Sequence, residues 1–229
     1  MKNLILSLPL AAAIASVATP AAAATVPEND TQFWAQASAS VKLNDQWKLS
    51  QEVTTRISDN RNGLYEVEMV SMVNYRIAKN VTLAAGYVRD PQYVEGDFSI
   101  MEQRAREQVT VDNLAKIAGG SVSVRMRLEQ RWRENLDGTG WRARPFVKYS
   151  LPLRNKVSLV LSSEPFVNLN KTAFQARDGL ERVRNFAGFN VPLAKNLTAE
   201  VGYLNQHGFV RNGPDTSDNV GSFSLSLSL

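Results

Sequence analysis

The chain has 229 residues, with no cysteine, one histidine and a formal net charge of +4. The absence of cysteine excludes disulfides, thiol catalysis and cysteine metal sites. The charge is too small to indicate a class of partner by itself, and the length suits one domain.

The N-terminal segment has the pattern of a secretory leader. Lys2 supplies a positive charge, residues 4–17 form an apolar run, and the alanines at 21–24 provide a small-residue cleavage site. The apolar run is shorter than the roughly 20 residues that a membrane-spanning helix needs. We therefore predict a cleaved signal peptide over residues 1–24, export across the inner membrane, and one domain over residues 25–229.

The segments that follow alternate polar and apolar residues with a period of two. The clearest is 124–133, where every odd position from 125 to 133 is charged and the even positions hold Val124, Met126, Leu128, Gln130 and Trp132. Side chains of a strand point alternately to opposite faces, so this segment is predicted to be a strand with one ionic and one mostly apolar face. The segments 47–57, 65–77 and 141–151 show the same period, and no long helical pattern competes with it after residue 24.

Short connections alternate with longer polar ones along the chain. The phrase IAKNVTLAAGY at 77–87 returns as LAKNLTAEVGY at 193–203, and each copy is predicted to be a tight turn followed by a strand. Further short turns are predicted at 44–46, 117–120 and 154–156, and longer loops at 59–63, 95–97, 134–140, 171–179 and 212–219. In an up-and-down antiparallel sheet the short turns then lie at one end and the longer loops at the other.

Alternation alone fits a soluble barrel or sandwich as well as a membrane barrel. Strands of roughly 10–14 residues favour the membrane barrel, because membrane strands need 9–11 residues. Aromatic residues on the apolar face also fall near predicted strand ends, as interfacial girdles do: Trp47, Tyr75 and Tyr149 by the short turns, and Tyr65, Tyr87, Trp132, Trp141 and Tyr203 by the loops. We predict an all-β transmembrane antiparallel up-and-down β-barrel of the outer membrane.

Eleven strand candidates begin near residues 31, 47, 64, 81, 98, 121, 141, 157, 181, 197 and 220. Bacterial single-chain barrels have even strand numbers and both termini on the periplasmic side, so we expect about twelve strands, with ten as the alternative. Pro145, Pro165 and Glu107 fit regular strands poorly. Proline donates no ladder hydrogen bond, and Glu107 would face lipid, so bulges or edge positions are expected there.

The last strand resembles the C-terminal signal that the outer-membrane assembly machinery reads. It alternates serines with Phe223, Leu225, Leu227 and Leu229, where Leu229 replaces the usual terminal aromatic residue. The whole mature chain is similar to an uncharacterised proteobacterial family of outer-membrane barrels, known only as a domain of unknown function. The resemblance rests on Trp34, Gln51, Glu52, Arg56, Gly86, Tyr87 and the segments 125–131 and 164–166. It implies the barrel fold and an outer-membrane location, hence contact with membrane lipid, lipopolysaccharide and the assembly machinery, and it implies no activity.

The ionic face is assigned to the lumen, where bases outnumber acids. It holds fourteen bases and seven acids: Lys48, Arg56, Arg76, Arg104, Arg106, Arg125, Arg127, Arg131, Arg133, Arg142, Arg144, Lys148, Arg182 and Arg184, against Glu52, Glu66, Glu68, Glu102, Glu129, Glu164 and Glu200. Arginine stays charged and binds carboxylates or phosphates with a fixed fork of donors, so the excess would attract anions. We predict a small anion-favouring channel for a small anionic solute, similar in architecture to arginine-lined barrels for acidic oligosaccharides. The alternative is a structural barrel that Arg–Glu pairs fill completely.

Enzyme activity is not expected from the sequence. The only histidine, His207, falls by strand parity on the apolar face, although Asp215, Ser217 and Asp218 in the following segment could approach it. A hydrolase with His207 as its base is kept as a minor alternative. There is no phosphate-binding loop, dinucleotide fingerprint or metal-ligand spacing, so no cofactor or metal is predicted. Nucleic acid is not expected as a partner, because the charges alternate through strands of an exported chain.

Overall fold

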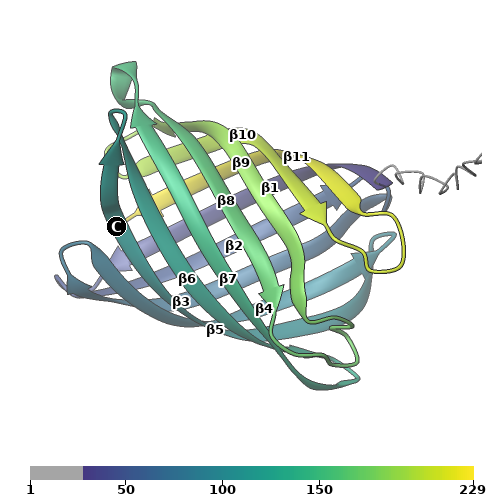
Figure 1. Cartoon of the computed structure of the whole chain (residues 1–229). Helices are drawn as coiled ribbons and strands as arrows, with labels where there is room; N and C mark the ends of the chain where they lie inside the picture. The colour runs from purple at the N-terminus through teal and green to yellow at the C-terminus, as the bar shows by residue number, and fades with distance from the viewer. Residues whose placement is uncertain (1–27) are drawn as a thin grey trace, which may run out of the picture.

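The computed structural model describes residues 28–229, so the predicted signal peptide lies outside the described residues. These residues form one closed barrel (Figure 1). Its strands are β1 (Glu28–Lys42), β2 (Trp47–Ser58), β3 (Gly63–Ala78), β4 (Val81–Val94), β5 (Asp97–Ile117), β6 (Gly120–Arg133), β7 (Leu136–Pro152), β8 (Ser158–Asn168), β9 (Gly179–Pro192), β10 (Leu197–Gly208) and β11 (Thr216–Ser228), with a 3₁₀ turn at Arg154–Lys156. In the part of the chain that the structure describes, no helix is long and apolar enough to cross a membrane.

Strands that follow one another in sequence pair antiparallel, and a parallel pair of β1 with β11 closes the barrel. The all-β barrel predicted from the sequence is thus confirmed, with eleven strands where about twelve were expected. The even number assumed that the closing pair is antiparallel. An odd number of alternating strands makes the first and last run the same way, so β1 begins at the loop end while the C-terminus lies at the short-turn end (Figure 1).

The two copies of the repeated phrase are turns at the same end of the barrel. Ala78 ends β3 and Val81 begins β4, whereas Pro192 ends β9 and Leu197 begins β10. The five short connections predicted from the sequence all lie at this short-turn end.

Two of the predicted longer loops are strand over several of their residues, and in 212–219 this is because β11 already begins at Thr216. The segment 134–140 is mostly strand, because β7 already begins at Leu136. The segment after β8 stabilises this extension: Leu169 donates a backbone hydrogen bond to the Trp141 carbonyl (2.8 Å), and Asn170 Nδ2 donates to the Thr139 carbonyl (2.8 Å). Such long-range support cannot be read from a glycine-rich local sequence.

The outer wall carries the apolar positions of the strands. Its exposed side chains include Leu49, Val53, Val73, Leu83, Val147, Leu161, Phe189, Val201 and Phe223. The predicted girdle position of Tyr65 is wrong. The pairing of β2 with β3 shifts at Arg56/Ile57, and this bulge turns Tyr65 into the lumen, where its hydroxyl donates to Gln32 Oε1 (2.7 Å). One extra residue reverses the parity of a strand locally.

The two prolines that fit poorly in the sequence pattern meet at a gap in the ladder. Ala143 pairs with Val167 and Val147 with Ser163, and no pair joins the residues between them, which include Pro145 and Pro165. Neither proline can donate to the ladder, so the strands run side by side there without the usual bonds. Glu107 does lie on the exposed outer wall, where its carboxylate accepts a long hydrogen bond from Gln130 Nε2 (3.5 Å).

Candidate functional site

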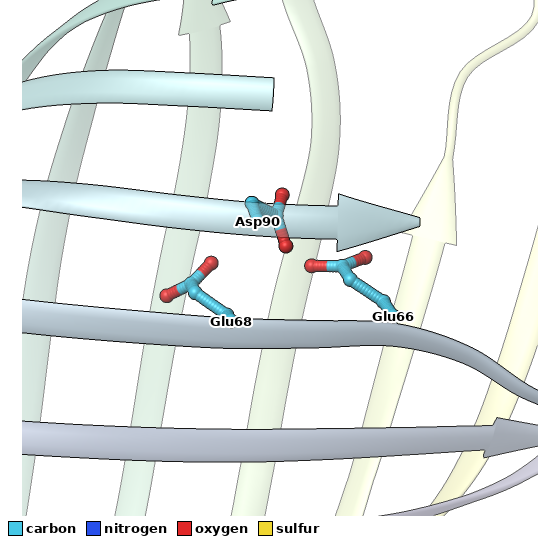
Figure 2. Close-up of side chains that lie close together, drawn as sticks. All are labelled: Glu66, Glu68 and Asp90. Atoms are coloured by element: carbon cyan, nitrogen blue, oxygen red, sulfur yellow. The ribbon is translucent and has the colours of Figure 1, made fainter. Parts of the chain in front are cut away.

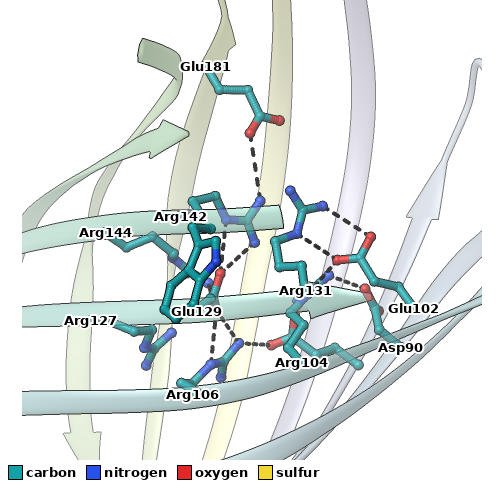
Figure 3. Close-up of polar contacts among 12 residues, drawn as sticks. Asp90, Glu102, Arg104, Arg106, Arg127, Glu129, Arg131, Arg142, Arg144 and Glu181 are labelled. Atoms are coloured by element: carbon teal, nitrogen blue, oxygen red, sulfur yellow. Dashed lines mark hydrogen bonds and ion pairs between the residues drawn. The ribbon is translucent and has the colours of Figure 1, made fainter. Parts of the chain in front are cut away.

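All fifteen residues predicted to line a pore lie on the inner face of the barrel wall. They come from six strands: Glu52 and Arg56 of β2, Glu102, Arg104 and Arg106 of β5, Arg125, Arg127, Glu129, Arg131 and Arg133 of β6, Arg142 and Arg144 of β7, Glu164 of β8, and Arg182 and Arg184 of β9. Most of them meet in one network of ion pairs in the loop-side half of the lumen (Figure 3).

Glu102 is the first centre of this network and is fully buried. Its carboxylate accepts hydrogen bonds from Arg104 Nε at 2.7 Å, Arg131 Nε at 2.9 Å and Arg133 Nη2 at 2.8 Å. Arginines from two neighbouring strands thus share one carboxylate. A carboxylate deprived of water is tolerated in such a place because it is paired and hydrogen-bonded.

Glu129 is the second centre and is equally buried. It pairs with Arg106 Nη2 at 2.9 Å, Arg142 Nη2 at 2.6 Å and Arg144 Nη1 at 2.9 Å, and these arginines lie on the strands on either side of β6 (Figure 3). Together the two glutamates hold six arginines that would otherwise repel one another. The network therefore depends on these two carboxylates more than on any one arginine.

A third group brings together Glu66 and Glu68 of β3 with Asp90 of β4, whose carboxylates face one another (Figure 2). One carboxylate oxygen of each residue lies within 4.8 Å of the others. The spacing of these residues in the sequence had not indicated this cluster. Arg104 pairs with Asp90 and with Glu68 (2.7 Å), and Arg56 pairs with Glu66. Because arginines already compensate these charges, the group extends the ion-pair network.

Aromatic rings lie against the guanidinium groups of the network. The Phe166 ring has four arginine Cζ atoms within 5.8 Å of its centroid, and the Trp34 ring lies 4.5 Å from Arg56 Cζ and 4.6 Å from Arg184 Cζ. Cation–π contacts of this kind strengthen when they are desolvated. Trp34 of β1 thus contacts arginines of both β2 and β9. These two strands lie on opposite sides of the parallel pair of β1 with β11, which we call the parallel seam.

The connection between β8 and β9 covers the loop end of the lumen. Its Gln175 is buried, and Arg131 Nη1 donates to Gln175 Oε1 (3.0 Å). The Phe174 ring lies 5.8 Å and 5.6 Å from the Cζ atoms of Arg131 and Arg133. The sequence predicted a loop here, but not that it folds inward onto the arginines.

Exposure of the inner side chains differs sharply between the two ends. Along β2, Ser58 at the loop end is 1% exposed, Glu52 is half-buried, and Lys48 at the short-turn end is exposed. Along β5, buried Glu102 and exposed Asp112 mark the same two ends. Among the described residues, the loop-side half therefore excludes water, whereas the lumen opens toward the short turns.

A cavity of about 430 Å³ lies in the lumen on the short-turn side of the network. Six bases and four acids line it: Arg56, Arg125, Arg127, Arg144, Lys148 and Arg184, against Glu52, Glu68, Glu164 and Glu200. The rest of the lining combines hydroxyl groups, such as those of Ser222 and Ser224, with the rings of Trp34, Phe146 and Phe186. The lining thus carries a net positive charge.

His207 lies near the loop end of β10 and contacts one of the residues expected to approach it. Its Nε2 is 3.1 Å from Asp215 Oδ2, and its ring packs against Phe209 at 4.7 Å. The backbone N–H of Val210 and the His207 ring hold the pKa of Asp215 below its usual value. Ser217 is the cross-strand partner of His207, and its hydroxyl accepts a hydrogen bond from Asn205 Nδ2 (2.9 Å).

A closed, mostly antiparallel sheet with an apolar outer wall and an ionic interior defines an outer-membrane-type β-barrel. The chain belongs to the family described as protein of unknown function DUF2490, whose model matches residues 31–218. This match confirms the resemblance predicted from the sequence. The chain is also 29% identical to an uncharacterized protein of Methylorubrum extorquens, over 94% of this chain and 95% of that protein.

Among solved structures, the chain is similar to LpxR from Salmonella typhimurium, with 10% sequence identity, a TM-score of 0.49 and coverage of 79% of this chain and 83% of that one. The expectation that the protein is not an enzyme is corrected, because a barrel fold by itself neither implies nor excludes catalysis.

Proposed function

We propose that the protein resides in the outer membrane as an anion-favouring barrel, closed on the loop side by its ion-pair network and accessible from the short-turn side. In outer-membrane barrels the short turns face the periplasm, so anions would enter from there. The final strand, with Phe223, Leu225, Leu227 and Leu229, would be read by the assembly machinery, and the outer wall would contact membrane lipid and lipopolysaccharide. Ion passage requires the network to open.

One observation carries the proposal: Glu102 and Glu129 are fully buried, and each holds three arginines of its own or a neighbouring strand. In an open channel, water would reach these carboxylates. The anion preference rests on the six bases and four acids of the cavity lining, because a narrow site lined by one excess charge concentrates the opposite ion.

Conductance in a planar bilayer under a salt gradient tests this proposal. The wild-type protein should give no steady conductance, whereas Glu129→Ala should release Arg106, Arg142 and Arg144 from their shared carboxylate and give steps with a reversal potential that favours chloride. The matched control is Glu107→Ala, which removes a carboxylate of the outer wall and should stay silent. Retained barrel mobility on a gel, without heating, shows that each variant is folded.

Each other result overturns one part of the proposal. Steady wild-type steps would show that the lumen is not closed. Cation preference in Glu129→Ala would remove the anion preference, and a folded but silent Glu129→Ala would show that the network is not the barrier.

The contact between His207 and Asp215 supports a second candidate function, ester hydrolysis at the barrel surface. Asp215 would orient the His207 ring as a base for the neighbouring Ser217 hydroxyl, an arrangement used in nucleophilic catalysis. Cleavage of a nitrophenyl ester by the refolded protein should then fall at least roughly 100-fold in both His207→Ala and Ser217→Ala. Equal cleavage by the wild type and both variants, or none by any of them, would eliminate this candidate.

A further inference from the structure

Two arginines of the lumen cavity are held without a counter-charge. Arg127 Nε donates to Gln108 Oε1 (3.0 Å), and Arg184 Nε donates to Gln206 Oε1 (2.7 Å). Within residues 28–229, neither guanidinium lies within 4.0 Å of a carboxylate. Removing a guanidinium from bulk water without a partner charge is costly, and a bound anion would offset that cost.

Three further arginines of the same cavity have a donor without an acceptor. The Nε atoms of Arg56, Arg125 and Arg144 are buried and have no hydrogen-bond partner among the described residues, although each of these arginines also pairs with a glutamate. A buried donor that is left unpaired costs more than a paired one gains. The arginines that carry these unmet donors thus line the same cavity as the uncompensated Arg127 and Arg184.

The same cavity also offers acceptors for hydroxyl groups. Glu52 of β2 and Glu200 of β10 line it, and no base lies within 4.0 Å of either carboxylate in the part of the chain that the structure describes. Along their strands they stand on the short-turn side of Arg56 and Gln206. Two carboxylates there disfavour a second negative charge on the ligand, but each can accept from a ligand hydroxyl.

We propose that this cavity binds one small hydroxylated oxyanion, such as a sugar acid. Its acid group would lie at Arg125, Arg127 and Arg184, and its hydroxyls against Glu52, Glu200 and the serines of β11. Arginine suits this role, because its planar fork matches the two oxygens of a carboxylate. About 430 Å³ accommodates a small solute. The inference deepens the proposed function and rests on its short-turn-side access.

Trp34 lines the cavity and reports on it directly. The variant Trp47→Phe/Trp132→Phe/Trp141→Phe leaves Trp34 as the single tryptophan, and its emission is followed in refolded protein. Iodide should quench Trp34 more strongly than caesium, because the cavity is positive. Glucuronate should change the emission saturably, glucose should not, and inorganic phosphate should bind more weakly because it cannot reach the hydroxyl acceptors.

Charge variants locate the binding. Arg127→Gln in the single-tryptophan background should raise the dissociation constant for glucuronate roughly tenfold, as expected for a charge-assisted hydrogen bond. The matched control is Arg211→Gln, which removes the same charge from the exposed segment between β10 and β11 and should leave the constant unchanged. Equal effects of the two variants would refute the site.

The remaining outcomes separate this inference from the proposed function. If iodide quenches Trp34 but neither glucuronate nor phosphate gives a saturable change, the lumen is accessible and the binding site is refuted. If iodide does not reach Trp34, short-turn-side access fails, and with it both proposals. If phosphate binds as tightly as glucuronate, the role of the hydroxyl groups is refuted.

Discussion

The two halves of the lumen use different chemistry within one wall. In the loop-side half, long charged side chains pair within and between neighbouring strands, and Glu102 and Glu129 each hold three arginines. In the short-turn half, the inner face of the wall carries small polar residues, among them Ser38, Ser50, Ser123, Ser224 and Ser226. The small side chains thus contribute to the opening of the short-turn half, although long bases such as Lys48 also lie there.

The comparison shows how one barrel can have a lumen that is filled at one end and open at the other. Arginine and glutamate fill the interior of the loop-side half and neutralise each other there, whereas serine leaves room for water and solute. The boundary between the halves is where bases remain without carboxylates, as at Arg127 and Arg184. A bound anion would be held at this boundary.

The largest expected effect comes from removing a shared carboxylate. Glu102→Ala should lower the free energy of unfolding by about 3–5 kcal/mol, because it leaves buried positive charges unpaired. Glu52→Ala removes a carboxylate with no base within 4.0 Å among the described residues and should lower it by less than about 1 kcal/mol. Urea unfolding in lipid vesicles, followed by tryptophan emission, measures both, and similar effects would show that the two halves are not energetically distinct.

Cysteine accessibility should separate the halves next. The chain has no native cysteine, so single variants report cleanly. Ser224→Cys on the open side should react with an anionic thiosulfonate roughly tenfold faster than with a cationic one, because the positive lumen concentrates anions. Ser58→Cys, at a position only 1% exposed, should react with neither. Reaction of both positions with both reagents would contradict the closure of the loop side.

The smallest effect concerns the segment that covers the loop end. Phe174→Ala should lower the free energy of unfolding by about 1 kcal/mol, because its ring lies over Arg131 and Arg133. Phe174→Leu keeps most of the apolar area and removes the π-face. If Phe174→Leu lowers the free energy of unfolding as much as Phe174→Ala does, the effect comes from the cation–π contact. If neither variant lowers it, the segment does not stabilise the network.

Strand parity predicted the inner face because alternation is a local property of the sequence. It could also have identified Asp90, which follows outward-facing Arg89 on β4. It could not place Tyr65 or Glu181, since each lies at a bulge where one extra residue reverses the parity. Bulges depend on how two strands are registered, and one strand alone does not show them.

The local sequence pattern also could not predict which side chains pair with one another in the lumen. That Glu129 binds arginines of both β5 and β7 depends on the stagger between strands. The inward fold of the segment with Gln175 likewise depends on Arg131 lying beneath it. The strand number was readable as eleven segments, and only the rule of even numbers moved the expectation to twelve.

The parallel seam places the first and last residues of the barrel wall at opposite rims. Because β1 and β11 run the same way, Glu28 stands at the loop rim and Leu229 at the short-turn rim. In the orientation proposed above, a reporter domain fused after Leu229 would face the periplasm, and one inserted before Glu28 would face the cell exterior. The two ends of the folded wall thus lie at opposite rims of the barrel, so each rim can be labelled separately.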